Sequence, residues 1–486
     1  MARPLGDKIR SVSLIFACGT ALFADGYANG VIGSVNTLLT RIYGADALSH
    51  HMYSRTLSSL AFFGEIVGML TFGYMSDKIG RKFGMMAATG IVIVFSVLSA
   101  ASKGAHGSVN GLLSMLSAMR FLVGIGIGAE YPCGSVAAAE QSSEPAISNT
   151  ARHRWVALAT NSMIDFGFVI AALVPLVLFW IFGDDHLNAV WRLSLGLAIV
   201  PSMAVFLWRL NMDEPVRYKK DSMKYARIPY MLVMRRYGVR LAAIAFIWFL
   251  YDFVAYPFGL YSSIIIDRIT GGSDNLIVVF GWNVIINLFN MPGTIGGALL
   301  LDRFGPKYTM ITALLLQATV GFIMSGAYER LTSHIAAFAV VYGIFLSFGE
   351  AGPGNCTILL AGKTSPTAVR GQFYGIAAAV GKLGAFVGTW AFPPIVNAFG
   401  GPNTTRGNTG PFWIGSGLAI ISAIVTVLFI HPLDAEDVIQ EDRNFREYLE
   451  AHGYDTSTMG LTGEESSTDT VEIDVNKKGD IKEHST

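Results

Sequence analysis

Long apolar runs recur along most of the chain, and polar residues gather in the short segments between them. A helix that crosses the hydrocarbon core of a membrane needs about 20 mostly apolar residues. The runs that meet this requirement cover residues 11–37, 56–76, 84–104, 110–138, 154–182, 190–209, 240–266, 276–300, 307–327, 334–362, 370–398 and 409–431. The first run is too long for a cleavable signal, so we interpret it as a membrane span. The pattern predicts an all-α polytopic membrane protein with twelve transmembrane helices.

Lys and Arg residues are distributed unevenly among the segments that join these runs. With the N-terminus inside the cell, the inner segments hold about three times as many of these residues as the outer segments. Basic residues accumulate in the cytoplasmic loops of membrane proteins. We therefore expect both the N-terminus and the C-terminus to lie in the cytoplasm.

The composition agrees with a membrane protein and argues against several other classes. Apolar residues make up 52% of the chain and charged residues 14%, whereas soluble domains have about 25% charged residues. The net charge is zero, and no basic patch with interleaved aromatic residues indicates a nucleic-acid partner. The three cysteines define no disulfide framework or metal site, and no nucleotide-binding glycine motif is present. We expect no cofactor and no metal, and no enzymatic activity, because no nucleophile, base and orienting group form a set.

The most basic stretch of the chain divides it into two halves of similar size. Residues 1–209 and 240–431 each hold six of the apolar runs, and residues 210–239 form a basic cytoplasmic linker between them. Residues 432–486 are rich in Asp, Glu, Ser and Thr, a composition typical of disordered segments. We predict two pseudo-symmetric six-helix halves and a largely disordered cytoplasmic tail.

A charged motif occurs once in each half, after its second apolar run. Asp77 is followed by Arg81 and Lys82 in the first half. The corresponding residues of the second half are Asp302, Arg303 and Lys307. Parallel repeats of this kind relate the two halves of many transporters. Because carboxylates and basic groups at helix ends can bridge two halves, we predict that these residues form a gate.

Several charged residues lie near the middle of predicted spans. A charge at the centre of a bilayer costs at least ~2.5 kcal/mol, and such residues usually face a partner or a water-filled pathway. The residues concerned are Asp25, Glu65, Arg120, Glu130, Asp165, Asp252, Glu350 and Lys382. Internal ion pairs that only hold helices together are the alternative. A set of this size favours a shared polar cavity between the halves.

Three segments resemble signatures of the major facilitator superfamily: residues 73–82 (GYMSDKIGRK), 120–132 (RFLVGIGIGAEYP) and 213–218 (DEPVRY). Within that superfamily, further segments resemble the fungal glycerophosphoinositol permeases, which are relatives of the proton-coupled phosphate symporters. They are residues 25–30 (DGYANG), 248–257 (WFLYDFVAYP), 370–384 (RGQFYGIAAAVGKLG) and part of the tail, 440–454. The resemblance implies proton-coupled import of a glycerophosphodiester across the plasma membrane by alternating access.

The resemblance also implies roles for individual residues. The helix-one aspartate and the acid of helix four, Asp25 and Glu130, correspond to proton carriers. The lysine of helix eleven, Lys382, corresponds to a phosphate anchor, and a single cation with three donors suits phosphate oxygens. The other residues that we expect to line the substrate site are Asp252, Trp248, Tyr131, Tyr27, Tyr251, Asp165 and Glu350. A permanent ion pair of Lys382 with Asp165 or Asp252 is the alternative.

The chain departs from the phosphate symporters in ways that bear on the substrate. Glu65, Asp165 and Glu350 have no assigned counterpart there, and their negative charges would repel a phosphate dianion. Trp248 and Asp252 are four residues apart and share one helix face; an aromatic ring beside an acid is a typical site for a choline head. Glycerophosphocholine is therefore an alternative to glycerophosphoinositol. An inorganic phosphate symporter and a nutrient sensor that signals through its tail remain further alternatives.

Asn403 begins an N-glycosylation sequon in a segment that we expect outside the cell. Sequons this close to the membrane are often not glycosylated, so we give equal weight to a glycosylated and an unglycosylated Asn403. The expected partners are a small phosphodiester, protons and the lipid bilayer, and we expect the chain to work as a monomer because its fold builds the pathway alone.

Overall fold

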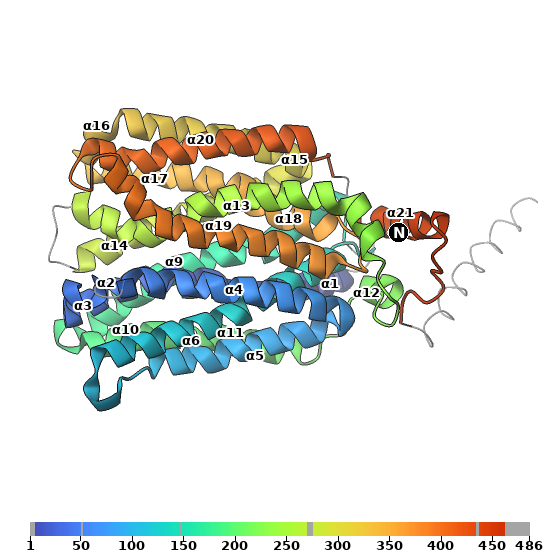
Figure 1. Cartoon of the computed structure of the whole chain (residues 1–486), viewed down its shortest axis with the longest axis horizontal. Coiled ribbons are helices and arrows are strands. Elements are labelled where there is room, and N and C mark those ends of the chain that lie inside the picture. The colour runs from blue at the N-terminus through green and yellow to red at the C-terminus, as the bar shows by residue number, and fades with distance from the viewer. Residues whose placement is uncertain (1–4, 50–51, 146, 270–275, 434–436, 462–486) are drawn as a thin grey trace, which may run out of the picture.

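The computed structural model describes residues 5–49, 52–145, 147–269, 276–433 and 437–461, and the regular elements in these ranges are all helices (Figure 1). Eleven helices of this part of the chain are long and apolar enough to cross a membrane. One of them, Leu276–Gly326, has 51 residues and holds two of the predicted runs. Its chain turns at Gly305, where φ is 74°, and Pro306 follows. The prediction of an all-α polytopic membrane protein is confirmed.

The helices that precede the linker lie together on one side of the molecule (Figure 1). They are α1 (Leu5–Gly19), η1 (Thr20–Leu22), α2 (Phe23–Tyr43), α3 (Ala45–Ser49), α4 (Tyr53–Lys78), α5 (Arg81–Ala100), η3 (Ala105–Gly107), α6 (Val109–Glu130), η4 (Tyr131–Ser135), α7 (Val136–Gln141), η5 (Asn149–Ala151), α8 (Arg152–Ala159), α9 (Asn161–Phe182), η6 (Asp184–His186), α10 (Leu187–Gly196) and α11 (Ile199–Arg209). Several predicted spans are thus built from two or three consecutive helical pieces.

The linker holds the short helix α12 (Val216–Asp221), and the remaining helices form the other side of the molecule (Figure 1). They are α13 (Tyr230–Ile269), α14 (Leu276–Leu288), α15 (Asn290–Gly326), α16 (Tyr328–Thr332), α17 (Ile335–Gly349), η7 (Glu350–Gly354), α18 (Asn355–Lys363), α19 (Arg370–Ala398), α20 (Thr405–Phe429) and α21 (Asp437–Ala451). We call the end of the bundle that holds α12, α21 and the N-terminus the linker end (Figure 1).

The two sides meet closely where α4 packs against α19. A Cβ atom added to Gly375 would lie 2.4 Å from the carbonyl oxygen of Met69, and one added to Gly73 would lie 2.9 Å from the oxygen of Gly371. Small residues let membrane helices approach backbone to backbone. The glycines of α4 and α19 therefore place the polar residues of one side within reach of the other.

The surface of the bundle is apolar and much of its interior is polar. Trp180, Ile181 and Leu428 are each at least 60% exposed, and a soluble protein would rarely leave so many large apolar side chains in water. Asp25, Glu65 and Lys382 are at most 1% exposed. This distribution is the one expected when hydrocarbon surrounds the helices and charges are kept for an internal site.

Two wide, π-helical turns interrupt the bundle at corresponding places. The turn η4 follows α6 and contains Pro132, and the turn η7 follows α17 and contains Pro353. Proline lacks the backbone N–H that continues an α-helix, and π turns occur often at functional sites. Both turns contribute a side chain to the cavity described below, Tyr131 from η4 and Glu350 from η7.

The segment after the last span is folded as far as the structure describes it, which corrects the prediction of a largely disordered tail for residues 437–461. Helix α21 buries Phe445 and Leu449 completely. The ring of Phe445 lies 6.0 Å from that of Tyr237, and the Tyr237 hydroxyl donates to Glu441 at 2.6 Å. The apolar residues of α21 are spaced for one helix face, so burial against α13 stabilises the helix. Residues 462–486 lie outside the described residues.

Candidate functional site

A cavity lies between the two sides of the bundle. Tyr131, Asn161, Asp165 and Phe168 line it from the first side. The second side contributes further residues, among them Trp248, Tyr251, Asp252, Tyr256, Asn287, Asn290, Gln317, Phe345 and Glu350. The structure therefore brings together Tyr131, Asp165, Trp248, Tyr251, Asp252 and Glu350, six of the eight residues predicted to bind substrate. Aromatic walls with a few convergent polar groups are typical of ligand sites.

Lys382 lies directly behind one wall of this cavity. Its Nζ atom is 3.1 Å from Asp25 Oδ2 and 3.1 Å from Glu65 Oε2. Asp25 and Glu65 belong to the first side of the bundle and Lys382 to the second, so the ion pairs join the two. The predicted alternative, a pair with Asp165 or Asp252, is not among the ion pairs of the described residues. We call these three residues the lysine cluster.

Neighbouring polar groups add hydrogen bonds to the lysine cluster. The Asn29 amide donates to Asp25 Oδ1 at 2.5 Å and to Glu65 Oε1 at 2.8 Å. Arg120 donates to Asn29 Oδ1 at 3.3 Å, which places a second cation nearby. A buried ion pair is stable only when its remaining lone pairs are satisfied in this way. With Arg120 counted, two basic groups face the two carboxylates.

Two tyrosines form the wall between the lysine cluster and the cavity. The hydroxyls of Tyr131 and Tyr256 both donate to Asp25 Oδ2, and the Tyr256 hydroxyl also contacts the Lys382 ammonium. The ammonium lies 5.1 Å from the ring centroid of Tyr131 and 3.9 Å from that of Tyr256, within the range of cation–π attraction. A small rotation of either ring would therefore connect Lys382 with the cavity.

A second group of carboxylates faces the cavity without a cation. Glu350 accepts hydrogen bonds from the Tyr251 hydroxyl at 2.6 Å and from the Asn161 amide at 3.1 Å. Asp165 Oδ2 and Asp252 Oδ2 are buried and have no hydrogen-bond partner. Among the described residues that line the cavity, none is Lys, Arg or His. The lining of the cavity is therefore rich in carboxyl groups, whereas the cations lie in the lysine cluster and at Arg120 behind it.

Glu130 and Tyr27 lie away from the cavity. Glu130 forms an ion pair with Arg209 at 2.7 Å, and Arg209 also donates to the carbonyl oxygens of Ala17 and Cys18. The Tyr27 hydroxyl donates to the Ser194 carbonyl at 2.6 Å. Both side chains thus contact only the first side of the bundle. The proposed proton role of Glu130 and the substrate role of Tyr27 stay predictions that the geometry does not support.

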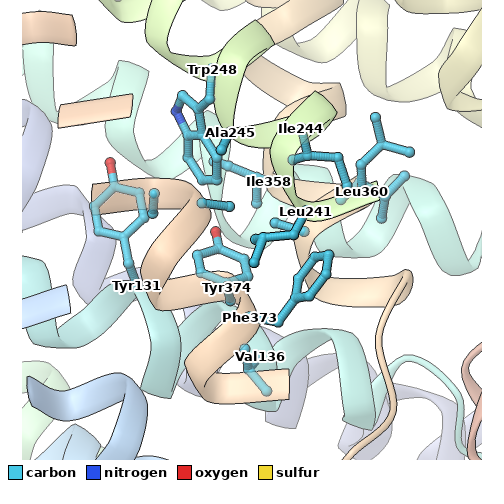
Figure 2. Packing of buried hydrophobic residues seen from close by; sticks show 14 of the residues in the cluster. Tyr131, Val136, Leu241, Ile244, Ala245, Trp248, Ile358, Leu360, Phe373 and Tyr374 are labelled. Carbon is cyan, nitrogen blue, oxygen red and sulfur yellow. The ribbon is translucent and has the colours of Figure 1, made fainter. Parts of the chain in front are cut away.

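An aromatic layer lies beside the cavity, where Tyr131, Trp248 and Tyr374 gather among buried aliphatic side chains (Figure 2). The ring of Trp248 lies 6.2 Å from that of Tyr131 and 5.7 Å from that of Tyr374. A Cβ atom added to Gly381 would be 2.6 Å from Trp248 Cδ1, so the indole ring requires glycine on α19. Trp248 therefore has two surfaces, one in the cavity and one in the packed layer.

Beyond the aromatic layer, buried ions join the two sides at the linker end. Arg81 lies 2.6 Å from Asp77 and 3.0 Å from Glu140. Glu140 is also 3.2 Å from Arg370, which begins α19. Arg370 in turn lies 3.4 Å from Asp442 of α21. We call these five residues the linker-end network; it connects the first side, the second side and the tail.

Asp77 and Asp302 each bind the N-terminus of a helix from the opposite side. Asp77 accepts from the backbone N–H groups of Gly371 and Gln372 at 2.8 Å each, at the start of α19. Asp302 accepts from the N–H of Arg154 at 3.1 Å, near the start of α8. Free N–H groups and the helix dipole favour a carboxylate there. The repeated motif thus makes the same contact twice, and its role in a gate stays a prediction.

The other predicted gate residues contact only their own side. Lys82 donates to the Leu210 carbonyl, Lys307 donates to the Val427 carbonyl, and Arg303 lies over the Phe304 ring. These basic groups are at the surface and hold local turns. Their gate role stays a prediction.

At the opposite end of the cavity the two sides meet through apolar residues. The rings of Phe179 on α9 and Phe280 on α14 lie 6.4 Å apart, with Leu176, Leu260 and Leu276 in the same buried cluster. Asn403 lies near this end in the exposed segment before α20. Its exposure is compatible with glycosylation, which stays a prediction.

Sequence reasoning missed several residues of the site. Glu65 was recognised as a mid-span charge without a role, and the contacts of Tyr256 with Asp25 and Lys382 were not foreseen, although Tyr256 follows Asp252 by one helical turn. Glu140 and Arg370 lie at the ends of apolar runs, where charges are common, so only the folded contacts reveal them. In the described part of the chain, no cluster of three or more His, Cys, Asp or Glu residues is arranged to hold a metal ion.

Comparison with known proteins agrees with this architecture. The sugar (and other) transporter family matches residues 12–227 and 219–445. The proton:xylose symporter XylE shares 18% identity with the chain and superimposes with a TM-score of 0.74, over 90% of this chain and 99% of that one. At this identity the likeness shows the fold alone, and the fold is that of the major facilitator superfamily.

Curated relatives share much more sequence. A glycerophosphocholine permease of Candida albicans is 43% identical over 94% of this chain and 85% of its own length. A major glycerophosphoinositol permease of the same organism is 41% identical over 94% and 85%. The glycerophosphoinositol transporter 1 of Saccharomyces cerevisiae is 35% identical over 97% and 89%. The chain therefore belongs to the sugar (and other) transporter family of the major facilitator superfamily, as a multi-pass membrane transporter among the fungal glycerophosphodiester permeases.

Proposed function

We propose that the protein imports glycerophosphodiesters across the plasma membrane together with protons, with its linker end in the cytoplasm. Residues 1–209 and 240–431 act as the two halves of an alternating-access carrier, and residues 210–239 join them. One chain encloses the whole cavity, so a monomer suffices. The observation that carries the proposal is the position of Lys382, held by Asp25 and Glu65 across the two halves behind the cavity wall.

Proton binding and phosphate binding are coupled through this lysine. While Asp25 and Glu65 are both ionised, they neutralise Lys382 and leave it little attraction for an anion. A proton on Asp25 removes one of its two partners, and the ammonium becomes available to a phosphodiester at the Tyr131–Tyr256 wall. Each ligand then favours the binding of the other. Asp25, which contacts Lys382, is the proton carrier in this scheme.

The coupling has an electrical reason. A phosphodiester carries one negative charge, and moving that charge into a negative cell costs about 2.3 kcal/mol per 100 mV. One accompanying proton cancels this cost, and additional protons drive accumulation. An inorganic phosphate dianion fits the cavity less well, because Asp165, Asp252 and Glu350 line it and the described lining residues include no cation to balance two negative charges.

Uptake measurements test the proposal directly. Radiolabelled glycerophosphoinositol and glycerophosphocholine are supplied to cells that lack their own carriers, with and without a proton uncoupler. We expect saturable uptake that the uncoupler abolishes. We also expect Lys382→Ala and Asp25→Asn to lower uptake at least about tenfold, since each removes a hydrogen bond to a charged group. The matched control is Lys103→Ala, at an exposed loop residue.

Two outcomes would contradict the proposal. Accumulation of inorganic phosphate without uptake of either diester would assign the protein to phosphate symport. A correctly placed protein that takes up neither diester nor phosphate would favour a nutrient sensor.

A further inference from the structure

The two halves also meet at the cavity through a pair of carboxyl groups. Asp165 belongs to α9 in the first half and Glu350 to η7 in the second half, and both line the cavity. The two carboxyl groups are hydrogen-bonded to each other. An ionised carboxylate accepts hydrogen bonds but has no hydrogen to donate. The contact between the halves therefore requires that one of the two groups holds a proton.

Electrostatics lead to the same requirement. Asp165 is 1% exposed, so little water screens a charge on it. Two carboxyl groups held this close in such surroundings share one proton, because both cannot ionise without strong repulsion. The described residues that line the cavity include no Lys, Arg or His to balance a second negative charge. The pair therefore binds one proton while the halves are in contact here.

Neutral donors hold the pair in place. The Tyr251 hydroxyl donates to Glu350 Oε1 at 2.6 Å, and the Asn161 amide donates to Glu350 Oε2 at 3.1 Å. Thr294 of α15 is completely buried, and its hydroxyl forms a hydrogen bond with Asp165. Thr294 also accepts from the Asn161 amide at 3.2 Å. These groups fix both carboxyl groups across the junction of the halves without supplying a positive charge.

The ionisable groups around the pair come from three elements. Helix α13 contributes Tyr251 and Asp252 to the cavity wall, and η4 contributes Tyr131. The lining residues of α14, α15, α17 and α18 carry no ionisable side chain. Helix α2 packs against α9 and carries Asp25, which is ion-paired with Lys382. Among these described groups the only cation is already engaged by the lysine cluster, so a proton is what joins the two carboxyl groups.

The pair is the counterpart of the lysine cluster in the internal repeat. Helix α9 lies in the fifth span of the first half, and α19 is the fifth span of the second half. Each carries one residue that contacts acids of the opposite half: Lys382 contacts Asp25 and Glu65, and Asp165 contacts Glu350. The ammonium group provides the positive charge at the first junction. The bound proton takes that place at the second junction.

We propose that Asp165 and Glu350 bind one proton between them and that this proton closes the cavity by joining the two halves. The site is separate from the proton carried by Asp25, and its role in closure rests on the proposed import by alternating access. When the halves part, water reaches the pair, the O–H bond breaks, and the proton leaves as hydronium. Two carboxylates remain, and their repulsion opposes closure until one of them is protonated again.

Infrared spectroscopy of the purified full chain tests the shared proton without any substrate. The carbonyl stretch of a protonated carboxyl group differs from that of a carboxylate. We expect a protonated-carboxyl band at pH 6.5 when the spectrum of Glu350→Gln is subtracted from that of the wild type, and the same band for Asp165→Asn. In each variant the new amide donates to the remaining carboxylate and no proton is needed.

The matched control for the spectra is Glu329→Gln, at an exposed carboxylate, which should give no such band. A band in the difference spectrum of only one of the two variants would mean that the proton belongs to a single residue. That result, or the absence of the band for both variants, would overturn the inference.

The pH dependence of cavity access tests the role in closure. Ala255 lines the cavity, and the reaction of Ala255→Cys with a thiol reagent reports how often the cavity opens. The native cysteines Cys18, Cys133 and Cys356 are buried, and the chain without Ala255→Cys gives the background rate. Each rate is divided by the rate in the Glu350→Gln background at the same pH, which cancels the titration of the thiol itself.

Between pH 5.5 and pH 8.5 we expect this ratio to rise at least about fivefold in the otherwise wild-type chain, since the loss of one bound proton changes an equilibrium by up to about tenfold per pH unit. The ratio should stay constant for Asp165→Asn. It should still rise for Asp25→Asn, whose proton serves uptake and not this junction. Surface protein is measured for every variant, so that poor folding is recognised.

The results separate the closing role from the proposed function. A constant ratio in the otherwise wild-type chain, a rise that Asp165→Asn retains, or a rise that Asp25→Asn abolishes would each overturn the closing role. A wild type that imports neither diester would overturn the proposed function, and the infrared bands would still decide whether Asp165 and Glu350 share a proton.

Discussion

At the linker end the two halves are joined by buried ions, whereas at the opposite end they are joined by aromatic and aliphatic side chains. The ionic contacts are directional and fail when one partner is removed. The apolar contacts between Phe179 and Phe280 have no fixed partner and re-form after any rearrangement that keeps the surface buried. The comparison teaches that, among the described contacts, a change in the charge of a side chain weakens or strengthens the junction of the two halves at the linker end. This is also the end that carries the tail.

The largest expected effect follows from breaking the linker-end network at its centre. Arg81→Ala leaves Asp77 and Glu140 buried without their cation, and such a loss costs about 3–5 kcal/mol. We expect a marked drop in the thermal unfolding temperature of the purified protein in detergent. The neighbouring substitution Lys82→Ala removes a half-buried side chain that pairs with no carboxylate among the described ion pairs, and its effect should stay within about 0.5 kcal/mol. Equal unfolding temperatures for both variants would show that the network does not hold the halves together.

A moderate effect is expected at the opposite end. Phe280→Leu removes part of a completely buried ring and should cost about 1 kcal/mol, or roughly fivefold in the closed-to-open equilibrium. The measurement is the rate at which a cysteine placed in the cavity by Thr357→Cys reacts with a reagent added outside the cell. Phe429→Leu, at a lipid-facing ring, is the matched control. Because the contact is apolar, we expect the acceleration to be independent of pH; a pH-dependent rate would contradict the comparison.

The smallest expected effect concerns the tail. Asp442 accepts from the backbone N–H and hydroxyl of Thr367 and lies beside Arg370. Burial, opposed by the nearby Arg370 charge and reinforced by that of Asp221, raises the pKa of Asp442 from 3.8 to about 6. The docked carboxyl thus holds its proton more tightly than a free one. Docking of α21 should therefore strengthen as the pH falls through 6 toward 4, and weaken above 6.

Hydrogen exchange of the α21 amides measures this docking, after correction for the intrinsic exchange rate at each pH. Between pH 7.5 and pH 5.5 we expect roughly a fourfold gain in protection. Asp442→Asn should remove the pH dependence. A variant that keeps the full dependence would mean that another group is titrating.

The spans were predictable because their signal is long and local. Each apolar run carries enough residues to cross a membrane, and the charges between runs indicate the topology. The tail helix was missed because the polar residues of α21 outnumber its few apolar ones; yet Val438, Phe445 and Leu449 share a face, and this spacing was available in the sequence. Composition alone was the wrong criterion there.

The residues that line the cavity were predicted more reliably than the contacts that these residues make. Charges near mid-span converge on a common pathway whatever their exact orientation, so Asp165, Asp252 and Glu350 were expected there. Which carboxylate meets Lys382 depends on the rotation and tilt of α2, α4 and α19. The sequence does not fix those angles, and for this reason Glu65 was left without a role and Glu130 was placed with Asp25.

The π turns η4 and η7 fix the rotational phase between two parts of each helix. The turn η4 itself presents Tyr131, its first residue, to the cavity, and α7, which follows it, presents Glu140 to Arg81 and Arg370. Deleting one residue of η4 would restore an α-helix but turn α7 by about 100°, carrying Glu140 out of the linker-end network. The length of each turn therefore sets how the cavity residues are rotated relative to the linker-end network. Adding or removing one residue would change that rotation even if every contacting side chain were preserved.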